Sequence, residues 1–339
     1  MKLIVHPVRL YLKGTFRIAH GTFLYRDAVI VELWDGIYSG YGEATAISYY
    51  GKSIDTFTTL LKKEKSFIEG LEWTHPEEFW ELLLPVFKNN LFLLCALDVA
   101  AWDLWAKRQK KPLYQAWGLE TKDLPLSNYT ISIDQIENMI RQMQDFPSPI
   151  YKIKLGTSED VAIVRALRAV SDAGFRVDAN GAWSASEAIH NSVALKKLGV
   201  AFIEQPLPVE DREGMRKVFQ ESVLPLIADE SCQVESDVAA CHGLFHGINI
   251  KLMKCGGFTP ALRMIKEARK RKLKIMCGCM TETSIGISAI AQLLPLLDYV
   301  DMDGALLLKN DPATGVQIQN GRVIYPNGNG HGAQLKVSY

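Results

Sequence analysis

Residues 174–204 have the sequence GFRVDANGAWSASEAIHNSVALKKLGVAFIE. Two short apolar runs, 174–178 and 200–204, enclose an amphipathic stretch of helical length, and the runs end in Asp178 and Glu204. A strand, a loop, a helix and a second strand in this order form one βα unit, and such units build a parallel sheet covered by helices. This stretch therefore predicts an α/β fold.

The same pattern recurs from about residue 126 onward. Eight apolar runs are predicted strands, and the polar or charged residues that close nearly all of them lie 22 to 28 residues apart. Eight units of this length close a (β/α) barrel, whose active sites lie at the carboxyl ends of the strands. Helix capping explains one or two such residues, but not a series of eight. The runs are 126–131, 150–155, 174–178, 200–204, 225–229, 247–251, 273–277 and 298–302, and the polar series is Thr130, Lys154, Asp178, Glu204, Asp229, Lys251, Cys279 and Asp301.

The first part of the chain has a different pattern. Residues 3–13 and 27–34 are predicted strands, and apolar residues then recur at helical spacing over 54–68, 76–87 and 91–109. Antiparallel strands followed by helices form an α+β unit. We therefore expect two domains, an α+β unit over residues 1–122 and the barrel over residues 123–314.

Composition excludes several classes of protein. Of the 339 residues 48% are hydrophobic and 22% charged, and Lys+Arg and Asp+Glu both number 38, so no net charge favours nucleic acid or an anionic membrane. Residues 1–9 lack the apolar length of a signal peptide, and the apolar stretch 91–106 contains Asp98 and Asp103, which indicates a buried helix. Six cysteines without a CxxC pair indicate reduced thiols and a cytoplasmic protein.

Three acidic residues close consecutive predicted strands. A barrel brings the carboxylates of Asp178, Glu204 and Asp229 side by side at its mouth. Three clustered anions need a cation, and ligation by oxygen atoms alone suits Mg²⁺. An isolated acidic residue is more often a helix cap, but three at matched strand ends favour a metal site.

Lysines close two other strands. Alternation along a strand points Lys152 and Lys154 to the same, interior face, and Lys251 closes the strand on the opposite wall. A lysine acts as a base only when its pKa falls from about 10.4 toward neutrality, and we expect adjacent positive charge and a metal to favour this. Two amines on opposite sides of a carboxylate bound to the metal can remove a proton from one face of a carbon and return one to the other.

A carboxylate pair follows the eighth predicted strand. Asp301 and Asp303 lie two residues apart and so share one face. The pair suits a substrate ammonium group, although a solvated turn before Gly304 explains it nearly as well.

Six short pieces, together and in order, resemble the enolase superfamily, and within it the muconate-lactonising-like subgroup and its dipeptide epimerases. The resemblance covers nearly the whole chain. It implies a modified TIM barrel, (β/α)7β, capped by an α+β domain at 1–122 that the tail at about 315–339 completes, with loops near 16–26 and 47–52 over the substrate. The pieces are Lys152-Ile153-Lys154, Val177-Asp178-Ala179-Asn180, Ile203-Glu204-Gln205-Pro206, Ala228-Asp229-Glu230-Ser231, Asn249-Ile250-Lys251-Leu252 and Gly256-Gly257.

The resemblance also implies the roles of single residues. It makes Lys154 and Lys251 the acid/base groups, and Lys152 a contact of the substrate carboxylate. The implied reaction inverts the α-carbon of the second residue of a dipeptide by proton transfer through an enediolate, and Asp301 and Asp303 hold the free amino group. The implied ligands of one Mg²⁺ per subunit are Asp178, Glu204 and Asp229, and the implied substrate contacts are Thr130, Lys152, Cys279, Asp301, Met302 and Asp303.

The first capping loop bears on the choice of dipeptide. In the family that the chain resembles, epimerases that act on Ala-Glu have an arginine in this loop, whereas the matching stretch here is Ile18-Ala19-His20-Gly21-Thr22. Arg17 or Arg26 could take the place of that arginine, but neither is at the matching position. Phe16, Ile18 and Phe23 offer apolar contact instead. We therefore expect small or hydrophobic dipeptides such as Ala-Ala as substrates, with Ala-Glu as the alternative.

Other functions fit the same scaffold. An o-succinylbenzoate synthase or a cycloisomerase would also use Lys154 as its base, but its reaction changes ultraviolet absorbance, whereas epimerisation incorporates solvent deuterium. A barrel kept only as a binding protein is a more remote alternative, because fold alone never establishes activity. The expected partner is a small-molecule substrate rather than nucleic acid or membrane, and a homo-oligomer is compatible with the sequence.

Overall fold

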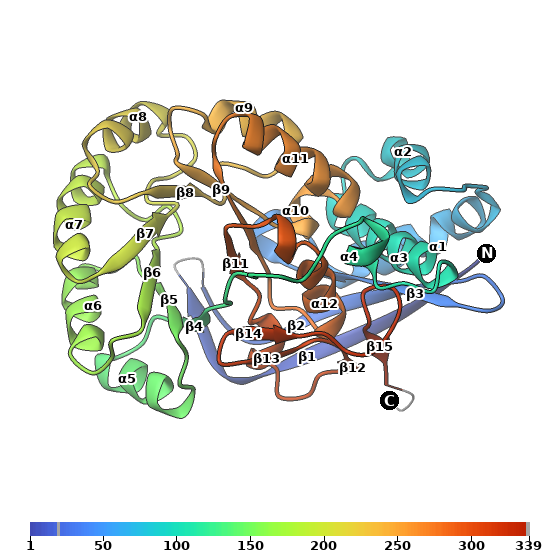
Figure 1. The fold of residues 1–339 in the computed structure, drawn as a ribbon, viewed down its shortest axis with the longest axis horizontal. Coiled ribbons are helices and arrows are strands. Elements are labelled where there is room, and N and C mark those ends of the chain that lie inside the picture. Colours follow the sequence, from blue (N-terminus) through green and yellow to red (C-terminus); the bar gives the residue numbers. More distant parts are fainter. Residues whose placement is uncertain (19–20, 337–339) are drawn as a thin grey trace.

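The computed structural model describes residues 1–18 and 21–336, and eight of its strands form one parallel sheet, rolled into a nearly closed barrel. Neighbouring strands pair in sequence order from β4 to β11, and a bridge between Ser127 and Val300 joins the two edges. Helices lie outside the ring (Figure 1). The strands are β4 (Tyr129–Ile131), β5 (Ile150–Lys154), β6 (Gly174–Asp178), β7 (Val200–Glu204), β8 (Leu226–Ala228), β9 (Gly247–Ile250), β10 (Lys274–Gly278) and β11 (Tyr299–Asp301).

Every connection between consecutive barrel strands contains a helix. Several of these helices begin at a residue whose side chain caps the N-terminus. Ser184 caps α7 in a reciprocal pair with Glu187, and Asp211 caps α8. After β11 the described residues contain a short 3-10 turn, Gly304–Leu307, in place of an eighth barrel helix, so the fold is (β/α)7β as expected. The helices are α5 (Ile136–Asp145), α6 (Asp160–Arg168), α7 (Ala185–Lys197), α8 (Arg212–Glu221), α9 (Glu235–Cys241), α10 (Leu252–Cys255), α11 (Phe258–Lys270) and α12 (Ser284–Gln292).

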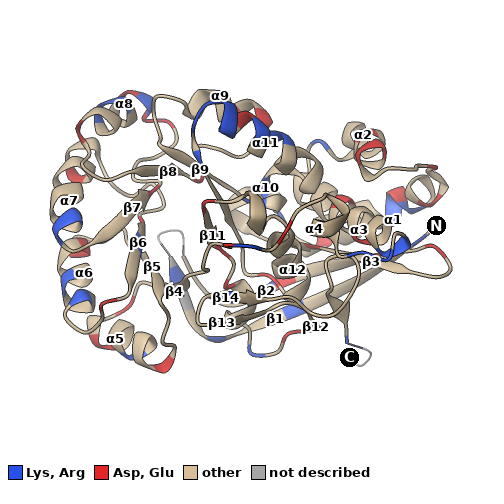
Figure 2. Cartoon of the chain, in the orientation of Figure 1, with Lys and Arg blue, Asp and Glu red and all other residues tan. Residues whose placement is uncertain are grey.

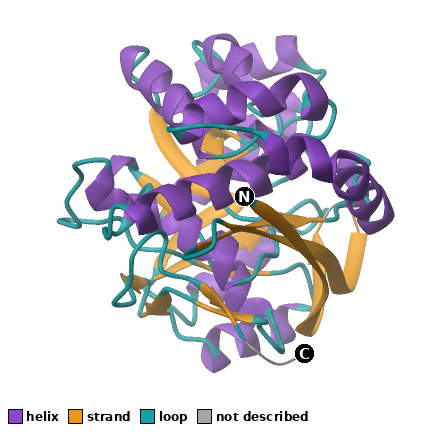
Figure 3. Cartoon of the chain, turned by 90° about the vertical axis from the view of Figure 1, so that its right-hand side faces the viewer, coloured by secondary structure: helices purple, strands orange, loops and turns teal. Residues whose placement is uncertain are grey.

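The first part of the chain is an antiparallel sheet with helices packed on it. The strands are β1 (Lys2–Ile18), β2 (Gly21–Trp34) and β3 (Ser39–Thr45), and the helices are α1 (Ile54–Gly70), α2 (Pro76–Phe87), α3 (Leu91–Arg108) and α4 (Leu113–Ala116). Both strands of the β1–β2 pair are longer than predicted, because they continue as a two-stranded ribbon past a register shift between Tyr11 and Phe16. Figure 3 shows the long, curved strand that starts at the N-terminus from the side.

Helix α3 forms the centre of this first unit. It is buried along nearly its whole length, as the sequence predicted for the apolar stretch 91–106. Strand β3 packs directly on it, because Gly40 and Gly42 have no side chain: a Cβ atom there would lie 2.1 Å from the carbonyl oxygen of Ala100 and 1.9 Å from that of Ala96. Any larger residue at these two positions would push the sheet away from the helix.

Buried polar groups join the first unit to the barrel. Asp98 of α3 accepts hydrogen bonds from the backbone and hydroxyl of Thr259 at the start of α11. Glu43 of β3 accepts from the backbone and hydroxyl of Thr283, which caps α12. The ring of His331, near the C-terminus, bonds to the carbonyl of Tyr41 at 2.8 Å. These contacts fix the first unit against the open end of the barrel.

The C-terminal tail forms two small antiparallel pairs. They join β12 (Ala313–Thr314) to β15 (Gln334–Leu335) and β13 (Gln317–Gln319) to β14 (Arg322–Ile324). The last three residues of the tail expected over 315–339 lie outside the described part of the chain.

Charged residues of both signs are interspersed over the outer helices (Figure 2). No helix in the described ranges is long and apolar enough to cross a membrane.

Candidate active site

The carboxyl ends of the barrel strands surround a cavity of about 340 Å³ beneath the first unit. Thirteen of its lining residues come from the barrel strands and the segments that follow them, and six come from the β1–β2 ribbon and the segment 47–50. Among the predicted site residues, those that line the cavity are Thr130, Lys152, Lys154, Lys251, Cys279, Asp301 and Asp303.

Three carboxylates lie together in the floor of this site. Asp178 ends β6, Glu204 ends β7 and Asp229 follows β8, and one oxygen of each lies within 4.8 Å of the others. All three are fully buried. Burial and the neighbouring charge of Asp178 raise the pKa of Glu204 to about 7. The carboxylate cluster predicted from the strand ends is therefore present in the structure. Its three acidic groups repel one another when charged, so nearby positive charge stabilises the cluster.

Two lysines of β5 face this cluster from the same side. The Nζ atom of Lys152 lies 3.0 Å from Glu204 Oε1, 3.1 Å from Asp178 Oδ2 and 2.8 Å from Asp301 Oδ2. Lys154 donates to Asp178 at 2.6 Å and to the Asn180 side chain at 3.3 Å. Strand alternation thus brings both ammonium groups inside the barrel, as the sequence predicted.

Asp229 is held by two further lysines, one on each oxygen. Lys251 follows β9, four strands from Lys154, and donates to Asp229 Oδ2 at 2.7 Å. Lys254, three residues later on α10, donates to Asp229 Oδ1 at 2.6 Å and to the backbone carbonyls of Asp229 and Cys232. Lys254 is almost completely buried and does not line the cavity. This position indicates that Lys254 orients Asp229 and does not contact a substrate.

The lysine environment corrects one expectation. Burial alone would lower the pKa of Lys251, but the adjacent Asp229 outweighs burial and raises it well above its usual value. The pKa of Lys152 is likewise raised well above its usual value, because Asp301, Glu204 and Asp178 outweigh burial. For the two lysines of β5 the sequence suggested that adjacent positive charge and a bound metal would favour the neutral amine. In the structure Lys152 and Lys251 instead each face a carboxylate, which favours the charged form of the amine.

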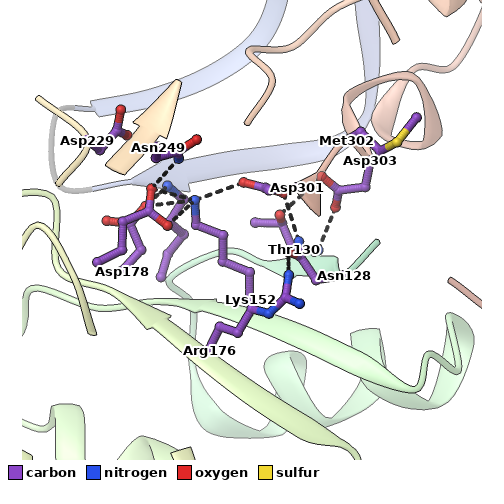
Figure 4. A network of polar contacts seen from close by, with 12 residues as sticks. Asn128, Thr130, Lys152, Arg176, Asp178, Asp229, Asn249, Asp301, Met302 and Asp303 are labelled. Atoms are coloured by element: carbon purple, nitrogen blue, oxygen red, sulfur yellow. Dashed lines mark hydrogen bonds and ion pairs between the residues drawn. The ribbon is translucent and has the colours of Figure 1, made fainter. Parts of the chain in front are cut away.

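The two acids at the end of β11, Asp301 and Asp303, have different environments (Figure 4). Burial opposes the charge of Asp301, but Lys152 outweighs it and lowers the pKa to about 2, and Asn128 donates to its other oxygen at 2.7 Å. Burial and the charge of Asp301 raise the pKa of Asp303 to about 7, although the backbone and hydroxyl of Thr130 both donate to it. This pair is built into the site and is not a solvated turn.

Of two other residues predicted to contact the substrate, one lines the cavity and one does not. Cys279 follows β10, is partly exposed and lines the cavity. Met302 is fully buried in the main hydrophobic core and is not among the cavity-lining residues, because strand alternation sends its side chain to the side opposite Asp301 and Asp303. The structure therefore does not bring Met302 to the substrate side.

The first unit covers the cavity with two segments. From the β1–β2 ribbon come Phe23 and Arg26, and the segment after β3 adds Ile47, Ser48, Tyr49 and Tyr50. The ribbon is fastened to the barrel, since the backbone N–H of Ile133 donates to the carbonyl of Arg17 at 3.1 Å. Residues 19 and 20 of the capping stretch, together with the side chains of Phe16 and Ile18, lie outside what the structure describes. Of the two arginines considered in this loop, Arg26 lines the cavity and Arg17 does not.

Several polar residues of the site were missed in the sequence. Asn249 donates to Glu204 at 2.8 Å, Arg176 donates to Asn128 at 3.1 Å, and Glu230 accepts from Asn180 at 3.2 Å. Asn128, Arg176 and Asn249 each stand two residues before a member of the strand-end series. Period-two alternation therefore points them inward, one layer deeper, and this signal could have found them. Lys254 had a weaker signal, a lysine in the otherwise apolar stretch 252–255.

Comparison with known proteins agrees with this geometry. Residues 1–118 match the model of the mandelate racemase / muconate lactonizing enzyme N-terminal domain, and residues 134–338 match the enolase C-terminal domain-like model. The chain belongs to this family. The enolase-superfamily resemblance drawn from six short pieces of sequence is thereby confirmed.

Individual relatives of the family are epimerases. An L-Ala-D/L-amino acid epimerase of Flavobacterium johnsoniae is 52% identical over 99% of this chain and 100% of its own length. Among solved structures, a dipeptide epimerase of Enterococcus faecalis complexed with Mg and L-Leu-L-Tyr is 30% identical, with a TM-score of 0.91 over 98% of both chains. One of Cytophaga hutchinsonii, complexed with Mg and D-Ala-L-Val, is 27% identical, with a TM-score of 0.92 over 99% of this chain and 96% of the other. This member of the enolase superfamily is accordingly an isomerase.

Proposed function

We propose that this protein is a Mg²⁺-dependent dipeptide epimerase that inverts the α-carbon of the second residue by proton transfer between two lysines. One observation carries the proposal: Lys154 and Lys251 line the same cavity from strands four apart in the barrel, and Asp301 and Asp303 line it too. The dipeptide ligands of the relatives from E. faecalis and C. hutchinsonii support it.

The carboxylate cluster fits a hard divalent cation. Its donor set consists of three carboxylates, with one oxygen of each within 4.8 Å of the others, and includes no histidine or cysteine side chain. Asp178, Glu204 and Asp229 would hold Mg²⁺, which when bound supplies the positive charge that offsets the negative charge developing on the substrate carboxylate. With their carboxylates engaged in this way, Lys154 and Lys251 lose the partners that keep them protonated.

The charges of the cavity orient the dipeptide. Asp301 and Asp303 attract the free ammonium group, while Lys152 attracts the terminal carboxylate. The α-carbon of the second residue then lies between Lys154 and Lys251. One lysine takes the proton from this carbon, the electron pair of the C–H bond moves into the carboxylate to give an enediolate, and the ammonium group of the other lysine returns a proton to the opposite face.

Apolar residues form part of the remaining cavity wall. Ile47, Tyr50, Met280 and Leu307 face the space left for the side chains of the dipeptide. Each methylene group buried against such a surface contributes about 0.8 kcal/mol. We therefore expect dipeptides with a small first residue and a small or aliphatic second residue, and Ala-Ala and Ala-Val should both be substrates.

A deuterium-exchange screen tests the proposal. The purified protein, with Mg²⁺ in D₂O, is incubated with a panel of dipeptides, and the expected result is one deuteron at the α-carbon of the second residue of Ala-Ala, seen by mass spectrometry and by loss of the α-proton NMR signal. A change of ultraviolet absorbance with succinylbenzoate precursors, without exchange in any dipeptide, would instead establish the synthase alternative.

Lys254 gives a separate prediction about the metal site. Lys254→Met removes the donor that fixes one oxygen of Asp229, and loss of such an orienting contact typically lowers metal affinity 10- to 100-fold. We expect a loss of about that size in Mg²⁺ affinity, measured by titration calorimetry. The exposed Lys266 on α11 provides the control variant, Lys266→Met. Equal Mg²⁺ affinities in the wild type and Lys254→Met would show that Asp229 needs no such support.

A further inference from the structure

Arg176 lies inside the barrel, one layer below the cavity. It stands two positions before the proposed metal ligand Asp178 on β6, and it is only 5% exposed. Its guanidinium carbon lies 5.6 Å from the centre of the Phe202 ring and 5.3 Å from that of the Tyr299 ring. The proposed proton transfer does not use this group. Because a buried cation is costly unless it is paired or hydrogen-bonded, the groups that accept from it are informative.

The side chain of Asn128 connects Arg176 to Asp301 (Figure 4). Nη1 of Arg176 donates to Asn128 Oδ1 at 3.1 Å and to the backbone carbonyl of Val300 at 2.8 Å. At the other end of the same amide, Asn128 Nδ2 donates to Asp301 Oδ1 at 2.7 Å. These three side chains therefore form a continuous chain from the barrel interior to Asp301, which lines the cavity.

The two ends of this chain allow the amide of Asn128 only one orientation. A guanidinium can only donate hydrogen bonds, and an ionised carboxylate can only accept them. Turning the amide over would place its N–H donors against Arg176 and its oxygen against Asp301, so both contacts would become repulsive. Asn128 is 2% exposed, which leaves little access for water to replace a lost partner. Arg176 therefore determines which end of the amide Asp301 meets.

Asp301 is held through both of its oxygens. Asn128 donates to Oδ1 at 2.7 Å, and Lys152 donates to Oδ2 at 2.8 Å. Two fixed donors restrict rotation of the carboxylate, and because each carboxylate oxygen can accept two hydrogen bonds, capacity remains for a further donor. Since Asp301 lines the cavity, a cationic group in the cavity meets a carboxylate whose orientation is already set.

We infer that Arg176 is a positioning residue, which fixes the amide of Asn128 and thereby orients Asp301 toward the ammonium group of the dipeptide without touching the substrate. The inference rests on the proposed function, in which Asp301 and Asp303 attract that group. Arg176 takes no part in proton transfer. Its loss should weaken recognition of the ammonium group and leave recognition of the terminal carboxylate unchanged.

The test compares Ala-Ala with N-propionyl-alanine, which has a hydrogen atom in place of the ammonium group. In the Mg²⁺-loaded enzyme, kcat and KM for Ala-Ala are measured by deuterium incorporation, and N-propionyl-alanine is measured through its inhibition constant in the same reaction. We expect Arg176→Met to lower kcat/KM for Ala-Ala on the order of 10-fold, mainly through KM, because a charge-assisted hydrogen bond is weakened. The inhibition constant should change by less than about twofold.

Two further variants distinguish positioning from packing. Arg176→Lys keeps a charged donor without the planar fork, so it should retain part of the affinity for Ala-Ala. Asn128→Leu removes the amide that transmits the effect, so combining it with Arg176→Met should cause little further loss. Losses that multiply in the double variant would overturn the inference, because the two residues would then act independently.

Arg168 of α6 supplies a matched control outside the site. Its guanidinium carbon lies 3.7 Å from the centre of the Phe175 ring, and it donates to the backbone carbonyl of Ala173 at 2.8 Å. It thus shares the aromatic and backbone contacts of Arg176 but has no connection through Asn128. Arg168→Met should leave both measurements unchanged.

The outcomes separate the inference from the proposed function. Equal losses for Ala-Ala and N-propionyl-alanine in Arg176→Met would overturn the inference, because Arg176 would then act on the shared carboxylate, through Lys152, or on folding. Unchanged constants for Ala-Ala in Arg176→Met would also overturn it and leave the epimerase proposal standing. Exchange in no dipeptide by the wild type would overturn both.

Discussion

Replacing either Lys154 or Lys251 by alanine is expected to lower the rate of epimerisation by about 10⁴-fold, because positioned acid–base groups contribute up to that factor and each lysine serves only one face of the α-carbon. The change should spare folding. Each lysine is close to a carboxylate at the cavity rather than in the hydrophobic core, and alanine removes bulk next to an existing cavity.

The two variants should differ in which stereoisomer still exchanges. In Lys154→Ala, Lys251 can still remove and return the proton on its own side, so one isomer of the second residue incorporates deuterium without inversion. Lys251→Ala should show the same behaviour with the other isomer. The measurement follows deuterium content and stereochemistry together for L,L and L,D dipeptides. The exposed Lys196 of α7 provides the control, Lys196→Ala. Normal epimerisation in either active-site variant would exclude a two-base mechanism.

Glu204→Gln is expected to lower kcat/KM on the order of 1,000-fold, since the charge that metal ligation supplies to the transition state is worth several kcal/mol. The substitution keeps the volume of the side chain and an oxygen that can accept from Asn249. It replaces a fully buried carboxylate, crowded by Asp178, with a neutral amide that binds Mg²⁺ more weakly.

Calorimetric titration with Mg²⁺ gives a readout of Glu204→Gln that is independent of activity. We expect weaker binding and a melting temperature within a few degrees of the wild type in the absence of metal, because the lost charge was repelled by its neighbours. Chelation of the wild type should likewise remove activity, and added Mg²⁺ should restore it. Full activity after exhaustive chelation would contradict the assignment of Asp178, Glu204 and Asp229 as ligands.

The strand-end residues were predictable from sequence because a barrel repeats one local pattern. Each of the units around Asp178 and Glu204 contains its own strand and helix signals, so the spacing alone brings Lys154, Asp178, Glu204 and Asp229 to one rim. The lysine side of the site was predictable for the same reason, since alternation within 150–154 determines the face of both ammonium groups.

Contacts that depend on the meeting of distant segments were harder to predict. The sequence left open whether Arg17 or Arg26 takes the place of the family's loop arginine, because neither is at the matching position. In the structure the ribbon extends to Gly21, and Phe23 and Arg26 line the cavity. Nothing local in the sequence indicates how far a two-stranded ribbon continues beyond its sheet. Lys152 was expected among positive neighbours, but the fold surrounds it with Asp178, Glu204 and Asp301.

Two separate parts of the chain, the barrel and the β1–β2 ribbon, contribute residues to the cavity wall, and this division has an evolutionary consequence. All groups proposed to move protons or hold the metal come from the barrel, whereas Phe23 and Arg26 come from a ribbon whose strands pair mainly with each other. Mutations in the ribbon can therefore accumulate without disturbing the chemistry. Grafting residues 16–26 from a relative with another preference would transfer that preference to this barrel in one step. Substrate choice in such enzymes can drift quickly while the reaction itself stays constant.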